Sequence, residues 1–365
     1  MKRLLSLTLA LLMTVALFGA VGVPTCTCAE EAAPDNPYVG LWTVTGVQEK
    51  DVYTSAAETE QTIYFDFLPT GAIYGVSIEG DFVEDHYFAY VVTGENTLDI
   101  YEGEEALASV YDPETGVITV TSPDATMAVF LQRVTEDPLP DIRAMVDHSQ
   151  EERVYGGYRT VLGTMEYDLI DFSVVLDAEP DECYNLTLEP DGMGHVQAGS
   201  ESMSTDIRWT DATIAPANND SPEAVIPYTR ENDHIIIDFG GMIVDYAPLG
   251  EVLMLMVLKN RELASADPLV SEEMVGTWEL TKRIAFGIEV PSDASSSEMT
   301  VVVKKNNTAI VYTSNMTPAG YHIIKNGEGA LIMHASGVDL YEMTYTAPNL
   351  TLTYMGIEFI FERAD

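Results

Sequence analysis

A short pattern of a glycine, any residue and an aromatic residue recurs three times along the chain, and it limits the fold more than any other feature. It stands at Gly40-Leu41-Trp42, Gly156-Gly157-Tyr158 and Gly276-Thr277-Trp278. The spacings between copies are nearly equal, as expected for tandem repeats of one structural unit. Because 365 residues are many for a single domain, three separately cored units are predicted.

Each copy of the motif is followed by the same order of strand and turn signals. An alternating apolar and polar segment leads into a polar turn and then into a second alternating segment. The turns are Leu68-Pro69-Thr70-Gly71, Glu189-Pro190-Asp191-Gly192 and Lys304-Lys305-Asn306-Asn307. Their Pro, Gly and Asn residues favour the restricted or left-handed backbone of tight turns, so β-hairpins are predicted.

Each copy also ends alike, on an apolar segment closed by a basic residue. The predicted closing strands are 127–133 with Arg133, 252–258 with Lys259, and 357–363 with Arg363. No segment shows a helical period over three turns, apart from a short helix expected near residues 141–146, so the chain is predicted to be all-β.

The predicted organisation follows from these boundaries. It comprises a signal peptide at 1–29, a linker at 30–37, and three barrel units at 38–134, 154–260 and 274–365, joined by linkers at 135–153 and 261–273.

A Gly-x-Trp opening, a run of antiparallel hairpins and a closing strand ending in a basic residue resemble the lipocalin and lipocalin-like families of the calycin group. The resemblance implies three tandem small antiparallel up-and-down β-barrels; a β-sandwich or another small barrel is the alternative. It also implies that the first-strand aromatic packs across the barrel base under the closing cation, a cation–π contact worth about 0.5–2 kcal/mol. The implied pairs are Trp42 with Arg133, Tyr158 with Lys259, and Trp278 with Arg363, all as structural signatures.

The first residues carry the pattern of an export signal, since basic Lys2 and Arg3 precede an apolar run and then small residues. Cleavage after Ala29 is expected; an uncleaved anchor and a lipid anchor at Cys26 or Cys28 are the alternatives. No later apolar segment is long enough to span a bilayer, so the mature chain is expected to be secreted or associated with the cell envelope. Cys183 would then be left unpaired, and a half-buried strand position is its expected role.

The formal charge of −42 excludes some partners. Such a chain repels nucleic acid and anionic lipid headgroups, so neither is an expected partner.

Patterns that carry chemistry are missing from the sequence. There is no Gly-x-Ser-x-Gly elbow, and the six histidines stand singly without a zinc-binding spacing. No catalytic residue, metal site or cofactor is predicted, and the chain is not expected to be an enzyme.

The expected function is a non-enzymatic binding protein that holds an apolar small molecule within a barrel or a protein partner on its surface. The middle barrel is the expected host, because Met242, Met254 and Met256 offer flexible side chains that adapt to an apolar ligand. A structural or adhesive spacer with sealed barrels is the alternative, and a hydrolase on a calycin-like barrel is a more remote one.

Overall fold

The computed structural model describes residues 36–58, 61–102, 105–178, 184–198, 200–231, 233–290, 298–314, 318–326, 329–335 and 338–364. The predicted signal peptide with Cys26 and Cys28, and also Cys183, lie outside these residues. Within the described part of the chain, no helix has the length and apolar character needed to cross a membrane.

Each repeat folds into one antiparallel sheet of nine strands that closes on itself. Barrel 1 consists of β1 (Gly40–Glu49), β2 (Val52–Ser55), β3 (Gln61–Phe67), β4 (Ala72–Glu79), β5 (Phe82–Gly94), β6 (Thr97–Glu102), β7 (Glu105–Asp112), β8 (Val117–Thr121) and β9 (Met127–Arg133). Barrel 2 consists of β10 (Arg153–Leu162), β11 (Met165–Asp168), β12 (Tyr184–Leu188), β13 (Met193–Ala198), β14 (Ser200–Trp209), β15 (Thr213–Pro216), β16 (Ile226–Glu231), β17 (His234–Asp238) and β18 (Met242–Pro248). Barrel 3 consists of β19 (Gly276–Ala285), β20 (Ile288–Val290), β21 (Met299–Val303), β22 (Thr308–Thr313), β23 (Ala319–Lys325), β24 (Leu331–Ala335), β25 (Val338–Thr346), β26 (Asn349–Tyr354) and β27 (Ile357–Arg363).

The order of the strands is the same in all three sheets, and it confirms the predicted all-β fold of three tandem up-and-down barrels. In barrel 1, β3 to β9 follow one another as neighbours, and β9 returns to pair with β1. The short strand β2 pairs with the second half of β1, while β3 pairs with its first half. Eight strands therefore close the barrel, and the ninth is a side hairpin; β11 and β20 occupy the same place in the other two.

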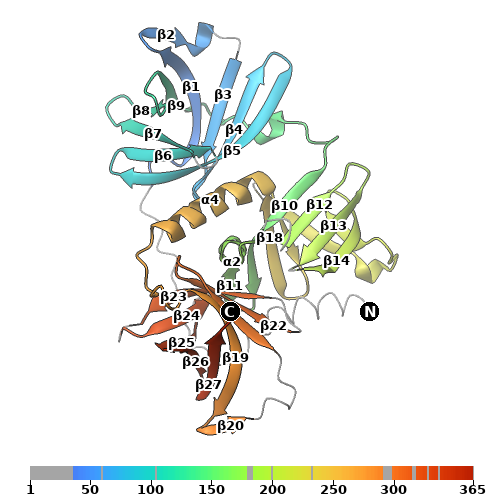
Figure 1. Ribbon diagram of the computed structural model, residues 1–365. Helices are drawn as coiled ribbons and strands as arrows, with labels where there is room; N and C mark the ends of the chain where they lie inside the picture. The colour runs from blue at the N-terminus through green and yellow to red at the C-terminus, as the bar shows by residue number, and fades with distance from the viewer. Residues whose placement is uncertain are drawn as a thin grey trace.

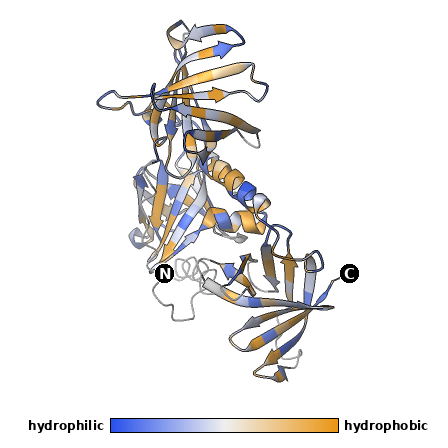
Figure 2. Cartoon of the chain, turned by 90° about the vertical axis from the view of Figure 1, so that its left-hand side faces the viewer, coloured by the Kyte–Doolittle hydropathy of each residue, from blue (hydrophilic) through white to orange (hydrophobic). Residues whose placement is uncertain are grey.

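Hydrophobic and hydrophilic residues alternate along many of the strands (Figure 2). Because successive side chains of a strand point to opposite faces, this alternation directs one set toward the barrel interior. In β21, for example, Met299, Val301 and Val303 are buried while the residues between them are more exposed. Each barrel has its own apolar core, and these cores are separate clusters. The three repeats are therefore three separately cored units.

In the two outer barrels, the closing arginine lies over the ring of the motif tryptophan. Trp42 and Trp278 are each only 1% exposed. The guanidinium carbon of Arg133 is 4.8 Å from the Trp42 ring centroid, and that of Arg363 is 5.7 Å from the Trp278 centroid. Each arginine stands directly opposite its tryptophan in the pairing of the first and last strands. The cation–π contact thus ties the two strands together at the barrel end.

The glycine of the motif leaves room for that arginine. Gly40 and Gly276 have positive φ angles of 118° and 144°. A Cβ atom at Gly40 would lie 3.1 Å from Nη1 of Arg133, and one at Gly276 would lie 2.8 Å from Nη2 of Arg363. Both the backbone conformation and the close guanidinium therefore require glycine at this position.

In the middle barrel, the motif predicted at Gly156-Gly157-Tyr158 is not equivalent to the other two. The first strand of each barrel has a bulge, which falls at Thr45 in barrel 1, at Tyr158 in barrel 2 and at Thr281 in barrel 3. Counted from the bulge, the residue that corresponds to Trp42 is Tyr155, and Pro248 stands opposite it.

Barrel 2 therefore lacks the tryptophan, the closing arginine and the glycine together. Arg153 occupies the position of the motif glycine, and its guanidinium carbon lies 5.0 Å from the ring centroid of Trp209. Because no closing arginine covers this end of barrel 2, the residue at the position of the motif glycine does not have to be glycine. The predicted pair of Tyr158 with Lys259 is wrong.

Two α-helices lie within the described residues, and neither was predicted. Helix α2 (Leu169–Leu176) begins at Asp168, whose side chain accepts a hydrogen bond from the Asp171 amide, an N-cap. Helix α4 (Leu249–Ser265) follows β18 directly. The predicted closing strand at 252–258 is thus wrong, since this segment is helical and β18 closes the barrel instead. Short 3-10 helices also occur at η1 (Ala56–Glu58), η2 (Arg143–Met145) and η3 (Pro222–Ala224), and η2 falls within the segment where a short helix was expected.

The two helices of barrel 2 contact the other barrels (Figure 1). Helix α4 packs against β4 and β5 of barrel 1, and α2 packs against β22 and β23 of barrel 3. The two helices also contact each other. Buried Ala72 from barrel 1 packs in one cluster with Val252 and Leu255 of α4. Barrel 2 is therefore the central unit, and its helices hold the outer two.

Contact between α4 and barrel 1 depends on the small size of Gly250. A Cβ atom there would lie 2.5 Å from Cδ2 of Tyr87. Glycine to alanine in a helix usually stabilises by about 0.5–1 kcal/mol. We expect Gly250→Ala instead to lower the free energy of unfolding by about 1–3 kcal/mol, because the helix must shift away from barrel 1.

Chemical denaturation measures this effect, and limited proteolysis of the 134–152 segment reports on separation of the barrels. Leu253→Ala on the exposed side of α4 is the matched control, with a smaller expected loss and no change in proteolysis. An increase in stability for Gly250→Ala would contradict the packing.

Candidate functional site

A cleft of about 610 Å³ lies where α4 joins barrel 1 to barrel 2. Its walls come from the β3–β4 turn of barrel 1, from β10, β11 and α2 of barrel 2, and from α4. The lining residues are Thr70, Tyr158, Arg159, Glu166, Asp168, Ile170, Leu255, Leu258, Lys259 and Glu262. The candidate site is thus outside the barrels, at their junction.

One face of α4 forms a whole wall of this cleft. Leu255, Leu258, Lys259 and Glu262 follow one another at intervals of three and four residues, which places them on one side of a helix. Leu255 is buried, and across the cleft Ile170 of α2 is buried as well. Apolar side chains of both helices therefore line part of the cleft, and Lys259 and Glu262 add charge to the wall formed by α4.

Tyr158 lies in the cleft because it is the bulge residue of β10. A bulge re-aims a side chain out of the regular alternation. The Tyr158 ring packs edge-on to His234, with ring centroids 5.3 Å apart. Burial, followed by the charge of Glu251, raises the pKa of Tyr158 to about 12, so its hydroxyl stays protonated at neutral pH.

Four of the five charged side chains that line the cleft are already joined in ion pairs. Arg159 reaches Glu166 with Nη1 at 3.2 Å and Asp245 with Nε at 3.1 Å. Nζ of Lys259 lies 3.2 Å from Asp168. Burial lowers the pKa of Lys259, but the nearby aspartates, together with Glu262, outweigh this and raise it. Lys259 is therefore a cation of the cleft wall and does not cover a barrel end.

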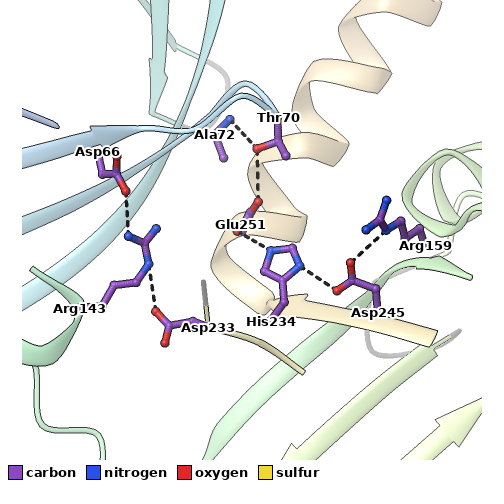
Figure 3. A network of polar contacts seen from close by, with 9 residues as sticks. All are labelled: Asp66, Thr70, Ala72, Arg143, Arg159, Asp233, His234, Asp245 and Glu251. Atoms are coloured by element: carbon purple, nitrogen blue, oxygen red, sulfur yellow. Dashed lines mark hydrogen bonds and ion pairs between the residues drawn. The ribbon is translucent and has the colours of Figure 1, made fainter. Parts of the chain in front are cut away.

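Behind the cleft, His234 lies between two buried carboxylates (Figure 3). Its Nδ1 is 2.8 Å from Asp245 and its Nε2 is 3.3 Å from Glu251. The side chains of these residues are 14%, 6% and 2% exposed, respectively. Thr70 of barrel 1 donates a hydrogen bond of 3.3 Å to the second carboxylate oxygen of Glu251. The network thus joins β17, β18 and α4 of barrel 2 to barrel 1.

The two carboxylates keep His234 charged. Burial by itself lowers the pKa of His234, but the hydrogen bonds and charges of Asp245 and Glu251 outweigh it and raise the pKa to about 9. At neutral pH both ring nitrogens therefore carry a hydrogen and donate hydrogen bonds to the two carboxylates. A general base needs a free, unprotonated nitrogen, so this arrangement is suited to holding α4 and not to proton transfer.

A second ionic contact joins barrels 1 and 2 through the linker. Arg143 of η2 lies 2.8 Å from Asp66 of barrel 1 and 3.1 Å from Asp233 of barrel 2. Its guanidinium carbon is also 4.7 Å from the Tyr74 ring centroid. The linker therefore holds the two barrels together through an ionic contact that is separate from the His234 network (Figure 3).

The three methionines predicted to line one ligand cavity do not lie together. Met242 is in the core of barrel 2 and is 5% exposed. Met254 and Met256 are on α4, and Met256 packs in the cluster between barrels 1 and 2. The prediction is wrong for Met254 and Met256 because it placed a strand where the chain forms a helix.

Sequence reasoning missed the residues that form the cleft and its support. His234 and Glu251 carry no recognisable motif, and their distance in sequence gives no sign of contact. The signal that was available is the spacing of Leu255, Leu258 and Glu262, which fits a helical face. In the described part of the chain, no group of three histidine, cysteine or acidic side chains is arranged to hold a metal ion.

Comparison with known proteins gives no family for this chain. No family model and no curated protein matches it. Among solved structures, it is similar to transferrin binding protein B from serogroup B Neisseria meningitidis, with 9% identity, coverage of 89% of this chain and 76% of that one, and a TM-score of 0.17. A protein of unknown function of the DUF3598 family from Nostoc punctiforme matches with 8% identity, coverage of 90% and 97%, and a TM-score of 0.17. At TM-scores this low, we argue function from the residues of this chain alone.

Proposed function

We propose that the chain is an exported, non-enzymatic binding protein built from three lipocalin-like barrels, and that it binds a small molecule in the cleft between barrels 1 and 2. The observation that carries the proposal is the cleft itself. Its volume of about 610 Å³ falls in the range of roughly 300–1,000 Å³ that is typical of small-molecule sites. Small-molecule sites combine apolar side chains with polar groups that orient the ligand, and both kinds line this cleft.

The network of His234, Asp245 and Glu251 behind the cleft favours binding over catalysis. The pKa of His234 is strongly raised, and both of its ring nitrogens face carboxylates. A rigid, already paired network holds the walls in place before a ligand arrives, which lowers the cost of binding. It offers no unpaired base for a reaction.

Two further features support the lipocalin-like and exported parts of the proposal. The outer barrels are closed by a tryptophan under an arginine, which is the contact that the lipocalin resemblance implies. The basic and apolar pattern of the first residues supports export.

A structural spacer is the second candidate, and the docking of the barrels favours it. Helices α2 and α4 connect all three units. Asp171 of α2 also lies 2.7 Å from His322 of barrel 3, and Asp177 lies 2.9 Å from Lys304. Such contacts would hold the barrels at fixed positions even without a ligand.

Blocking the cleft with a large side chain distinguishes the binding protein from the structural spacer. Glu262→Trp adds a large side chain on the cleft face of α4, while Asn260→Trp adds the same side chain on the same helix but outside the lining. We expect the purified protein to bind the neutral fluorescent dye Nile red at one saturable site. The first variant should weaken this binding at least tenfold, and the second should leave it unchanged.

Native mass spectrometry of the protein purified from its own cell gives an independent measurement, with a small molecule expected on part of the population. An empty protein that takes up no dye would overturn the binding function and leave the spacer. Equal dye binding by the two variants would place the site elsewhere.

A further inference from the structure

The ligand class can be inferred from the charges that line the cleft, provided that the cleft is the binding site proposed above. Three carboxylates and two cations line it, so the lining has a net negative charge. Both cations already face carboxylates. An anionic ligand would have to compete with Glu166 and Asp245 for Arg159, and with Asp168 for Lys259.

Glu262 differs from the other two carboxylates of the lining. It lies on the exposed rim of α4, and no cation of a described residue lies within 4 Å of its carboxylate, although its charge helps to raise the pKa of Lys259 one helical turn before it. Glu166 and Asp168 are each paired with a cation. Because Glu262 is not held in a close salt bridge as the other two are, its carboxylate can accept a cationic group at the mouth of the cleft beside Lys259.

The field of the whole chain acts in the same direction. The formal charge is −42 at pH 7. At physiological ionic strength, charges beyond about 8 Å are largely screened, so the remote carboxylates mainly raise the rate at which cations arrive. The carboxylates of the cleft itself decide the preference once the ligand is bound.

Apolar side chains line the same cleft. Ile170 and Leu255 are buried, and Leu258 and the Tyr158 ring pack beside them in the same cluster. Leu258 precedes Glu262 by one helical turn, so an apolar side chain of the lining and the Glu262 carboxylate are neighbours on α4. A ligand with an apolar part and a charged end would contact both.

We propose that the cleft binds a cationic amphiphile, with an ammonium group at Glu262 and an apolar chain lying on Ile170, Leu255 and Leu258. The paired cations Arg159 and Lys259 hold the remaining carboxylates in place and exclude anionic amphiphiles. The apolar chain lies between two barrels and does not enter the interior of either.

Three probes of equal chain length test this proposal on the full mature protein. Octylammonium, octan-1-ol and octanoate differ only in their head group, and calorimetric titration below their micelle concentrations measures each affinity. We expect octylammonium to bind at least ten times more tightly than octan-1-ol, and octanoate to bind most weakly. Higher salt should weaken octylammonium binding and leave octan-1-ol almost unchanged.

Glu262→Gln isolates the charge, because it keeps the size of the side chain. It should lower the affinity for octylammonium at least fivefold and leave that for octan-1-ol unchanged. Glu114→Gln, an exposed carboxylate in the β7–β8 turn of barrel 1, is the control and should change neither.

The possible outcomes separate the two proposals. Equal or tighter binding of octanoate or octan-1-ol, or an unchanged affinity in Glu262→Gln, would overturn the cationic ligand while leaving a binding cleft. If none of the three probes binds and the protein from its own cell is empty, the binding function itself fails.

Discussion

Replacing Trp278 with alanine is expected to lower the free energy of unfolding of barrel 3 by about 3–5 kcal/mol. The ring is almost fully buried, and its indole N–H donates to the Met274 carbonyl at 2.8 Å. The substitution leaves a cavity, an unpaired carbonyl and an arginine without its aromatic partner. Trp42→Ala should have the same effect in barrel 1, where the corresponding bond to the Tyr38 carbonyl is 2.7 Å.

Denaturant unfolding followed by circular dichroism measures these losses. Arg363→Lys, which keeps the charge but loses the planar group, should cost only about 0.5–2 kcal/mol. Trp209→Phe in barrel 2 is the control for loss of a tryptophan, and its cost should be smaller because that ring is only half-buried. If Trp278→Ala unfolded at the same denaturant concentration as the parent protein, the closing contact would have no stabilising role.

The second large effect is expected at Glu251, whose side chain is 2% exposed. Glu251→Leu removes one carboxylate from His234 and leaves Thr70 without its acceptor. Removing one partner of a buried ion pair typically costs about 3–5 kcal/mol. Because Glu251 also contacts barrel 1, the loss should appear in the transition that separates barrels 1 and 2.

A double variant tests whether the charge or the packing matters. When both partners are replaced by apolar residues, much of the stability of a buried pair usually returns. His234→Leu combined with Glu251→Leu should therefore cost less than the sum of the two single changes. Additive losses in calorimetric scans would show that the two residues do not interact.

The same network gives a pH dependence with a definite sign. The pKa of His234 is raised from 6.5 to about 9 in the folded chain. The imidazolium therefore stabilises the fold fully below about pH 6.5, and this contribution is lost as the pH rises through about 9. A difference of this size corresponds to a contribution on the order of 3 kcal/mol. The difference in stability between the parent and His234→Leu should shrink over this range, and a constant difference would rule out the ionic role.

Much of the architecture could be predicted from the sequence because local patterns repeat three times. The hairpins at β3–β4, β12–β13 and β21–β22 carry turn residues that fix their place, and the structure confirms them. The closing strands β9 and β27 were predicted for the same reason. Trp42 and Trp278 could be paired with Arg133 and Arg363 because they occupy the ends of the repeat.

The middle repeat shows where this reasoning fails. Gly156-Gly157-Tyr158 has the right composition but lies three residues later than the true counterpart of the tryptophan, Tyr155. Because this motif was aligned with the other two copies, the closing strand was also placed too late in the sequence. The segment 252–258 was therefore predicted as a strand, although it lies in helix α4. A register error of this kind can be recognised only from the position of the bulge, and no local pattern marks that position.

The cleft could not be predicted for a different reason. Its residues come from a turn of barrel 1, two strands of barrel 2 and two helices. They meet only because α4 leaves β18 and packs on barrel 1. Local sequence patterns determine the elements, whereas this site depends on how two completed barrels dock.

The position of the tryptophan and arginine also determines how the outer barrels would respond to tension. The first and last strands are antiparallel neighbours, so the chain enters and leaves each outer barrel at the same end, beside Trp42 and Arg133 in barrel 1. A pull on the two ends acts along the interstrand hydrogen bonds, which would open one after another. The closing contact is the first to bear the load. In barrel 2, the last strand continues into α4, so tension from the C-terminal side would first peel this helix from barrel 1.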